Sequence, residues 1–159
     1  RSPEKAQAVA DDVAPLARHG ATVTAGDLSN LGGSLAAGAR VPDAVVNCTP
    51  LGMKGGPDPN ASPVSGPMVR RLAEVSQGRA VVVELVYRPH NTPLFDHVDS
   101  AGLPDRFVGG LNVLCAQAER QFEAWTGVVP VPHQFFRSVA ALCRSPRPED
   151  RALWLGQDA

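Results

Sequence analysis

Three short polar stretches of the sequence carry side chains that could contact a ligand, and each follows an apolar segment. In "NCTPLGM", Thr49 offers a hydroxyl and Gly52 lets backbone approach a ligand closely. In "ELVYRPHNTPL", the ring of Tyr87 can pack while its hydroxyl forms a hydrogen bond with a ligand. In "GGLNVLCAQAERQFEAWTG", Gln117 falls at the edge of an apolar helix face. Each pattern also fits a structural role in a turn, in the core or between helices.

A fourth stretch, "RSPEKAQAVADDV", opens the chain. Ser2 suits a helix N-cap, and Pro3 suits the first turn of the helix that follows. Arg1 and Lys5 flank the Ser2 hydroxyl at this helix start, where the backbone N–H groups favour an anion. Two cations, a hydroxyl and a helix N-terminus suit a phosphate, and in NADP-binding sheets a basic residue takes the 2′-phosphate. Two solvated charges around a helix cap are the alternative interpretation.

The composition fits one globular domain. The chain has 159 residues, of which 43% are apolar and 19% charged, which is enough to bury a sizeable core. Its formal net charge of −1 gives no electrostatic reason to expect binding to nucleic acid or to an anionic membrane. No apolar run approaches the roughly 20 residues of a membrane helix. We therefore expect the ligand to be a nucleotide or another small molecule.

The cysteines and histidines give no sign of a metal centre or a disulfide framework. Cys48, Cys115 and Cys143 are odd in number, lie far apart, and form no C-x-x-C pair and no metal-ligand spacing with the histidines. We therefore expect no metal site. Free thiols are typical of a reducing compartment, so we expect a cytoplasmic protein.

The segments between the polar stretches alternate between apolar strands and amphipathic helices. Continuous apolar runs such as "DAVVN" and "AVVVELVY" predict buried strands, and Gly, Pro and cap residues separate them from helical segments. We expect helices at 3–18, 65–76, 92–102, 109–127 and 131–143, a weaker helix bearing Leu28, Leu31 and Leu35, and strands at 21–25, 43–47, 80–87 and 106–108. This alternation predicts an α/β fold with a doubly wound parallel sheet. Ligands bind such sheets beyond the carboxyl ends of the strands, where the polar stretches fall.

Taken together and in this order, the stretches resemble the carboxyl-terminal domain of the shikimate dehydrogenase family. "NCTPLGM", "VVVELVYRPHNTPL" and "GGLNVLCAQAERQFEAWTG" are similar to its patterns N-A-T-P/S-x-G-M, D-x-x-Y-x-P-x-x-T-P and G-L-x-M-L-x-x-Q-A with F-E-x-W-T-G. The opening "RSPEKA" is similar to the family's N-R-S/T-x-x-R/K-A stretch, which binds the 2′-phosphate of NADP. The resemblance covers about residues 1–143 and implies a Rossmann-like, NADP-binding domain.

The family reduces 3-dehydroshikimate to shikimate with NADPH, reversibly, and the resemblance implies roles for particular residues. It assigns contacts with NADP to Arg1, Ser2, Lys5, Thr49, Leu85 and Gly110. It assigns hydrogen bonds with the shikimate ring to Tyr87 and Gln117. It thereby favours a functional role over a structural one for Tyr87, Gln117 and Arg1. The family's proton-transferring Lys and Asp belong to its amino-terminal domain, so the resemblance implies no catalytic residue in this chain.

Two departures from the family pattern bear on the substrate. The strand acid is Glu84 where the family has Asp, and Asn112 and Val113 stand where the family has a Gly-Met pair. The family's Met lies against the nicotinamide, so a shorter Val loosens that contact. Quinate and an aminoshikimate therefore stay open beside shikimate as substrates.

Nothing in the sequence resembles the family's amino-terminal domain or its G-x-G-G-x-x-x-A turn, which holds the pyrophosphate. We expect an incomplete Rossmann-like domain at 1–144, lacking the first two strands of the sheet, and a polar tail at 145–159. We therefore expect that the chain alone is not a stable, active enzyme, and that it acts with an amino-terminal half or as a homodimer. The alternatives are a non-catalytic nucleotide-binding remnant, one half of a split enzyme, and a domain of a fused multifunctional protein.

Overall fold

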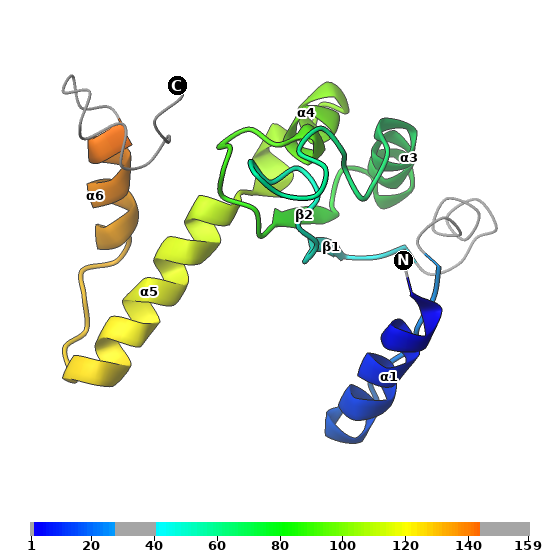
Figure 1. The fold of residues 1–159 in the computed structure, drawn as a ribbon, viewed down its shortest axis with the longest axis horizontal. Helices are drawn as coiled ribbons and strands as arrows, with labels where there is room; N and C mark the ends of the chain where they lie inside the picture. The colour runs from blue at the N-terminus through cyan, green and yellow to red at the C-terminus, as the bar shows by residue number, and fades with distance from the viewer. Residues whose placement is uncertain (1, 28–40, 144–159) are drawn as a thin grey trace. The chain divides into compact units, whose positions relative to one another are not determined.

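The computed structural model describes residues 2–27 and 41–143, and the chain forms two compact units. The first unit comprises Arg1–Val41 and the second Pro42–Ala159. Three predictions lie outside the described residues (Figure 1): the position of Arg1, the weaker helix around Leu28–Leu35, and the tail at 145–159.

In the first unit, an α-helix follows the predicted cap. α1 spans Pro3–Val13, and the hydroxyl of its N-cap Ser2 accepts a hydrogen bond from the Lys5 N–H at 3.4 Å. A 3-10 turn, η1 (Ala14–Leu16), follows the helix directly. The α-helix ends earlier than predicted because Pro15 lacks an N–H and its ring clashes with the carbonyl four residues before it.

The strand predicted at 21–25 is wrong. Residues 21–27 have no regular secondary structure, and the strands of the described chain all belong to the second unit. A strand exists only where its N–H and C=O groups pair with a neighbouring strand, and no described strand pairs with this segment. The β-branched residues of "ATVTA" favour an extended backbone, but they do not provide that partner.

The second unit contains the predicted parallel sheet. Its strands are β1 (Ala44–Asn47), β2 (Val81–Glu84) and β3 (Phe107–Val108), in the order β1-β2-β3. Val45 pairs with Val82, and Val83 pairs with Val108. All pairs are parallel, so the carboxyl ends of the three strands meet at one edge of the sheet. The α/β fold class is thereby confirmed, with a three-stranded sheet in the described part of the chain.

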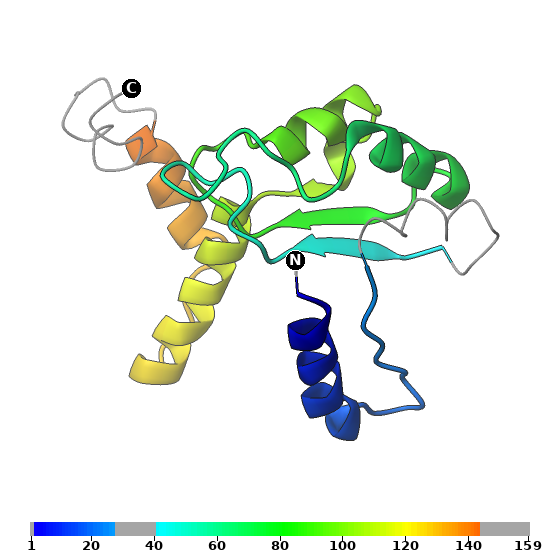
Figure 2. The ribbon, with the colours of Figure 1, turned by 45° about the vertical axis from the view of Figure 1, so that its right-hand side comes forward.

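Two helices cover one face of this sheet (Figure 2): α3 (Gly66–Ser76) and α4 (Pro93–Ser100). Their buried apolar residues form the core together with the middle of β2: Val69, Leu72, Leu94, Val98 and Val82. Thr92 is the N-cap of α4, as predicted, because its hydroxyl accepts the Phe95 N–H at 3.3 Å. The ring of Phe95 also meets Phe107 of β3 edge-on, with ring centroids 5.2 Å apart.

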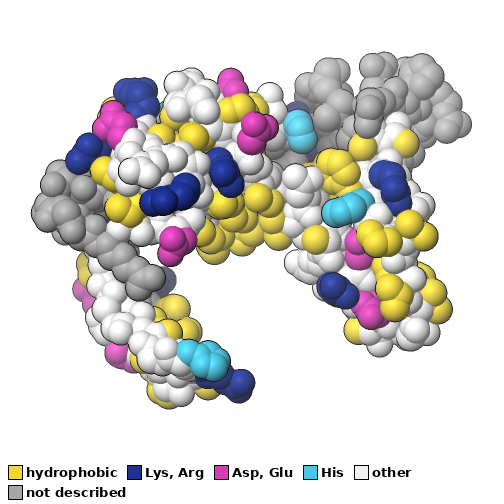
Figure 3. All heavy atoms as spheres, turned by 180° about the vertical axis from the view of Figure 1, so that it is seen from behind, with side chains coloured by type: hydrophobic (Ala, Val, Ile, Leu, Met, Phe, Trp, Pro, Cys, Tyr) yellow, Lys and Arg dark blue, Asp and Glu magenta, His cyan; other side chains and the backbone are white. Residues whose placement is uncertain are grey.

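The opposite face of the sheet is also apolar, but its side chains are more exposed to solvent. Strand alternation places Val46 and Val83 there, and Val46 is 51% exposed. Apolar side chains gather on the surface of the part that holds the sheet (Figure 3). Parallel sheets are normally covered by helices on both faces. This face therefore resembles the faces that helices cover in a complete doubly wound sheet.

Two further helices follow β3, which is preceded by the short 3-10 turn η3 (Pro104–Arg106). α5 (Gly110–Thr126) starts at the strand end and leads to α6 (Gln134–Cys143), which packs beside it (Figure 1). Gly127 ends α5 in the left-handed conformation, with φ of 70°, which glycine adopts without steric cost. Among residues 2–27 and 41–143, no helix has the length and apolar character needed to cross a membrane.

Candidate functional site

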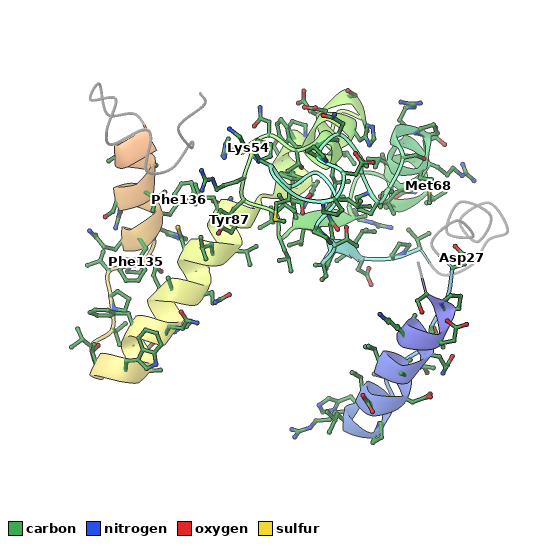
Figure 4. All side chains as sticks on the ribbon, viewed as in Figure 1. Asp27, Lys54, Met68, Tyr87, Phe135 and Phe136 are labelled. Atoms are coloured by element: carbon green, nitrogen blue, oxygen red, sulfur yellow. The ribbon has the colours of Figure 1, made fainter. Side chains whose placement is uncertain are left out.

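The loops that follow β1 and β2 meet at the carboxyl edge of the sheet. The Lys54 N–H donates a hydrogen bond to the Arg88 carbonyl at 2.8 Å, which joins the two loops. Between them lies a hollow of about 680 Å³. The residues that line it include Thr49, Met53, Lys54, Leu85, Tyr87 and Arg88. Lys54 and Tyr87 lie on the two loops at the strand ends (Figure 4).

Thr49 is held in the wall of this hollow by Asn47, the last residue of β1. The Asn47 side-chain oxygen accepts the Thr49 N–H at 2.9 Å and the Thr49 hydroxyl at 2.7 Å. The Thr49 oxygen in turn accepts the Leu51 N–H at 3.3 Å. Asn and Thr after a strand form this kind of turn readily, so the structural interpretation of the motif is correct. It is also compatible with a ligand contact, because Thr49 remains exposed.

Tyr87 and Leu85 lie on the second wall. Tyr87 is 45% exposed and Leu85 is 42% exposed. The alternative interpretation of Tyr87 as a core residue is therefore wrong. Large apolar and amphipathic side chains on the rim of a hollow are typical of small-molecule sites, where a few polar groups set the orientation of a ligand.

Glycine is required at two positions near this edge. Gly110 opens α5, and a Cβ placed there would be 2.3 Å from the Val86 carbonyl oxygen. Gly52 has φ of +82°, and its Cβ would be 3.2 Å from Pro93 Cδ. In both cases the space is filled by this chain's own backbone or side chains. Packing and turn geometry therefore explain both glycines, and a contact between Gly110 and a cofactor stays a prediction.

Gln117 lies in a different hollow, between α5 and α6. This second hollow has a volume of about 890 Å³. Its lining includes Gln117, Asn112, Val113, Arg120 and His133. The structure thus brings Thr49, Leu85 and Tyr87 together but does not place Gln117 in the same cavity. Val113, which stands where the family pattern has Met, lines the same hollow as Gln117.

Glu119 connects the two helices around this second hollow. Its carboxylate accepts the backbone N–H groups of His133, at 3.3 Å, and Phe135, at 3.2 Å. These groups are among the unpaired donors at the start of α6, so Glu119 caps that helix from α5. Burial, with a smaller contribution from the Glu119 charge, raises the pKa of the Cys115 thiol on the same helix. Cys115 is therefore held in its neutral, weakly nucleophilic form.

Ser2 and Lys5 lie in the first unit. Besides capping α1, the Ser2 hydroxyl donates a hydrogen bond to the Glu4 carboxylate at 3.0 Å. The Glu4 backbone N–H, followed by the Ser2 hydroxyl, lowers the pKa of Glu4. A phosphate at this helix start would have to take over the Ser2 hydroxyl from Glu4. The predicted contacts of Ser2, Lys5 and Arg1 with a 2′-phosphate stay predictions.

The sequence pattern does not predict the polar network around Glu84. Glu84 of β2 is 1% exposed and accepts hydrogen bonds from Asn47, Val86 and Thr92. One signal was available: a carboxylate inside the apolar run "VVVELV" must find several donors to be buried. Which residues supply these donors depends on strand register, which the sequence pattern does not give.

No family model matches the chain. The curated relatives include proteins named shikimate dehydrogenase (NADP(+)) from Nitrobacter winogradskyi, Rhizobium meliloti and Methanocella arvoryzae. The first two are each 37% identical over 139 residues, or 87% of this chain, and the third is 36% identical over 124 residues, or 77% of this chain.

The chain spans only 40% to 42% of the length of these three relatives. Among solved structures, a shikimate 5-dehydrogenase-like protein matches with a TM-score of 0.51 and 26% sequence identity. That match covers 67% of this chain and 36% of the other. The structural match supports the same Rossmann-like arrangement that the sheet and its helices show.

Proposed function

We propose, from the premise that this chain belongs to the shikimate dehydrogenase family, that it forms the cofactor side of an NADP-dependent shikimate dehydrogenase. The observation that carries the proposal is the hollow at the carboxyl edge of the sheet, in which Thr49, Leu85 and Tyr87 meet. This is the edge at which doubly wound sheets bind nucleotides. The chain thus contributes part of the site for the reversible reduction of 3-dehydroshikimate to shikimate.

The residues of this hollow fit a dinucleotide in their chemistry. The Thr49 hydroxyl can exchange hydrogen bonds with a ribose or an amide, and Leu85 provides an apolar surface for a flat ring. Lys54 and Arg88, which also line the hollow, supply positive charge toward an anionic cofactor. When bound, NADP⁺ would supply the hydride acceptor and NADPH the hydride donor, and the residues of this chain would bind and orient the cofactor.

For the substrate, we propose that Tyr87 and Gln117 donate hydrogen bonds to ring hydroxyl or carbonyl groups. Tyr87 is exposed enough to reach a ligand, and Gln117 lies on an exposed part of α5. The resemblance assigns proton transfer to a Lys and an Asp of the family's amino-terminal domain. The proposal therefore requires those groups from outside the segment that this chain matches, in the same or another polypeptide.

The position of Val113 bears on which substrate is used. Val113 and Gln117 line the same hollow, and the family's Met at the Val113 position lies against the nicotinamide. A smaller side chain leaves more room there. Quinate and an aminoshikimate are therefore retained as alternative substrates, and a direct comparison of the three compounds decides between them.

The proposal is tested by titrating the chain with NADPH and following the cofactor's fluorescence. We expect saturable binding that Thr49→Val weakens roughly tenfold, because the variant loses a hydroxyl but keeps the shape of the side chain. Thr126→Val is the matched control, since the Thr126 hydroxyl donates to the Phe122 carbonyl and accepts the Val128 N–H at the far end of α5, outside this hollow. Equal affinity in the Thr49 variant and the wild type would remove the main support for this site.

A further inference from the structure

The Glu84 carboxylate joins three separate segments of the second unit. It accepts the Asn47 side-chain N–H at 2.9 and 3.1 Å, which connects it to the end of β1. It accepts the Val86 N–H at 2.9 Å, at the start of the loop after β2. It also accepts the Thr92 hydroxyl at 3.3 Å, at the cap of α4. All of these groups are buried, and Glu84 itself is 1% exposed.

The contact with Asn47 determines which way the Asn47 amide points. A carboxylate only accepts hydrogen bonds, so the Asn47 group that faces it must be the NH₂. The Asn47 oxygen is therefore turned away from Glu84 and toward Thr49, where it accepts both the N–H and the hydroxyl. A rotated amide would set oxygen against oxygen at Glu84 and N–H against N–H at Thr49, which is costly inside a protein.

We propose that Glu84 is a positioning residue that orients Thr49 through Asn47 and holds the loop of Tyr87 through Val86. One buried side chain thereby sets both walls of the first hollow. The orientation itself rests on the geometry, whereas its consequence for cofactor binding rests on the proposed function. The alternative is that Glu84 contributes only to the stability of the core and leaves Thr49 free to move.

Amide hydrogen exchange of the full 159-residue chain separates the two possibilities. Glu84→Gln leaves one acceptor oxygen where the carboxylate has two, and it places an NH₂ group against donors that the second oxygen served. We expect exchange at Thr49 and Val86 to speed up roughly tenfold, while exchange in α5 stays as in the wild type. Glu74→Gln is the matched control, because Glu74 is an exposed residue that pairs with Arg71. Unchanged exchange at Thr49, or no protection of Thr49 in the wild type, would overturn the proposal.

A reciprocal exchange of the two side chains keeps the test decisive if Glu84→Gln alone does not fold. Asn47→Asp alone puts two carboxylates side by side and should also release Thr49. Combining Glu84→Gln with Asn47→Asp restores a donor facing an acceptor, and the new carboxylate can still accept from Thr49. We expect protection of Thr49 to return to within about threefold of the wild type. A folded double variant with an unprotected Thr49 would contradict the positioning role.

NADPH titration of the same variants connects the geometry with the function. If Thr49 must be pre-oriented, the apparent dissociation constant rises as the oriented fraction falls, by about tenfold for a tenfold smaller fraction. The double variant should recover affinity together with Thr49 protection. Loss of protection without loss of affinity would contradict the coupling to the cofactor. Absence of NADPH binding in the wild type would instead count against the proposed function and leave the exchange result intact.

Discussion

Gly110 lies against Val86 so closely that a Cβ at Gly110 would be 2.3 Å from the Val86 carbonyl oxygen and 2.5 Å from its carbonyl carbon. The first turn of α5 therefore rests directly on the backbone that follows β2. That backbone leads into Tyr87, whereas α5 carries Gln117 two turns further on. This contact thus fixes the start of the Gln117 helix relative to the Tyr87 loop.

Gly110→Ala should destabilise the chain, because neither backbone can move aside without breaking the strand end. We expect a loss of about 1–3 kcal/mol in the free energy of unfolding, measured by urea denaturation. Gly109→Ala is the control: its Cβ would be 3.5 Å from the Phe107 ring, an ordinary contact. Similar stabilities for the two variants would show that α5 does not depend on the close approach.

Glu119→Gln tests the connection between α5 and α6. The variant replaces a charged acceptor at the start of α6 with a neutral one, so we expect faster exchange of the His133 and Phe135 amides. The expected cost is about 1 kcal/mol. Removing the charge should also lower the pKa of Cys115, since that charge helps to raise it. Glu123→Gln, at a surface pair with Arg120, should change neither. A slow His133 amide in Glu119→Gln would rule out the cap.

Much of the second unit was predictable because its signals are local. The apolar run "AVVVELVY" and the cap at Thr92 depend only on residues that are neighbours in the sequence. The Asn47–Glu84 contact was not predictable in the same way, since it depends on which residues of β1 and β2 stand side by side. The strand predicted at 21–25 is wrong for the same reason, because the extended pattern of this segment contains no information about a partner strand.

The residues of the candidate site also differ in how well the sequence predicted their positions. Thr49 and Tyr87 were expected at one edge because parallel strands end together, and Leu85 was added by the resemblance. The structure places all three around one hollow. Gln117 was expected near the same edge, as part of the stretch that follows the predicted strand at 106–108, but it lines a second hollow. The direction in which α5 leaves the sheet depends on packing at Gly110. A helical pattern of apolar residues gives no information about that packing.

Arg1→Ala tests how the chain distinguishes NADP from NAD. If Arg1 contacts the 2′-phosphate, its loss should weaken NADPH binding roughly tenfold and leave NADH binding almost unchanged, because NADH lacks that phosphate. Titrations with both cofactors, at one fixed salt concentration, measure the difference. Arg18→Ala serves as the control, since it removes a cation from the same unit. Equal losses for NADPH and NADH would exclude a specific role for Arg1.

Gln117→Ala tests the substrate contact in a form of the enzyme that turns over. We expect the KM for shikimate to rise roughly tenfold, since a hydrogen bond to the substrate is lost, while the KM for NADP stays the same. Gln121→Ala, four residues further along α5 and exposed, is the control. An unchanged KM for shikimate would assign Gln117 a structural role between the helices.

The most direct test of the central claim is hydride transfer by the chain joined to the amino-terminal portion of a relative, which contains the parts that this chain does not match. Formation of NADPH from NADP and shikimate is followed by absorbance, with quinate and NAD as comparisons. We predict turnover with NADP and shikimate in the joined protein, a strong reduction by Arg1→Ala or Gln117→Ala, and none from either portion alone. A joined protein that unfolds cooperatively but transfers no hydride with any of these compounds would contradict the account.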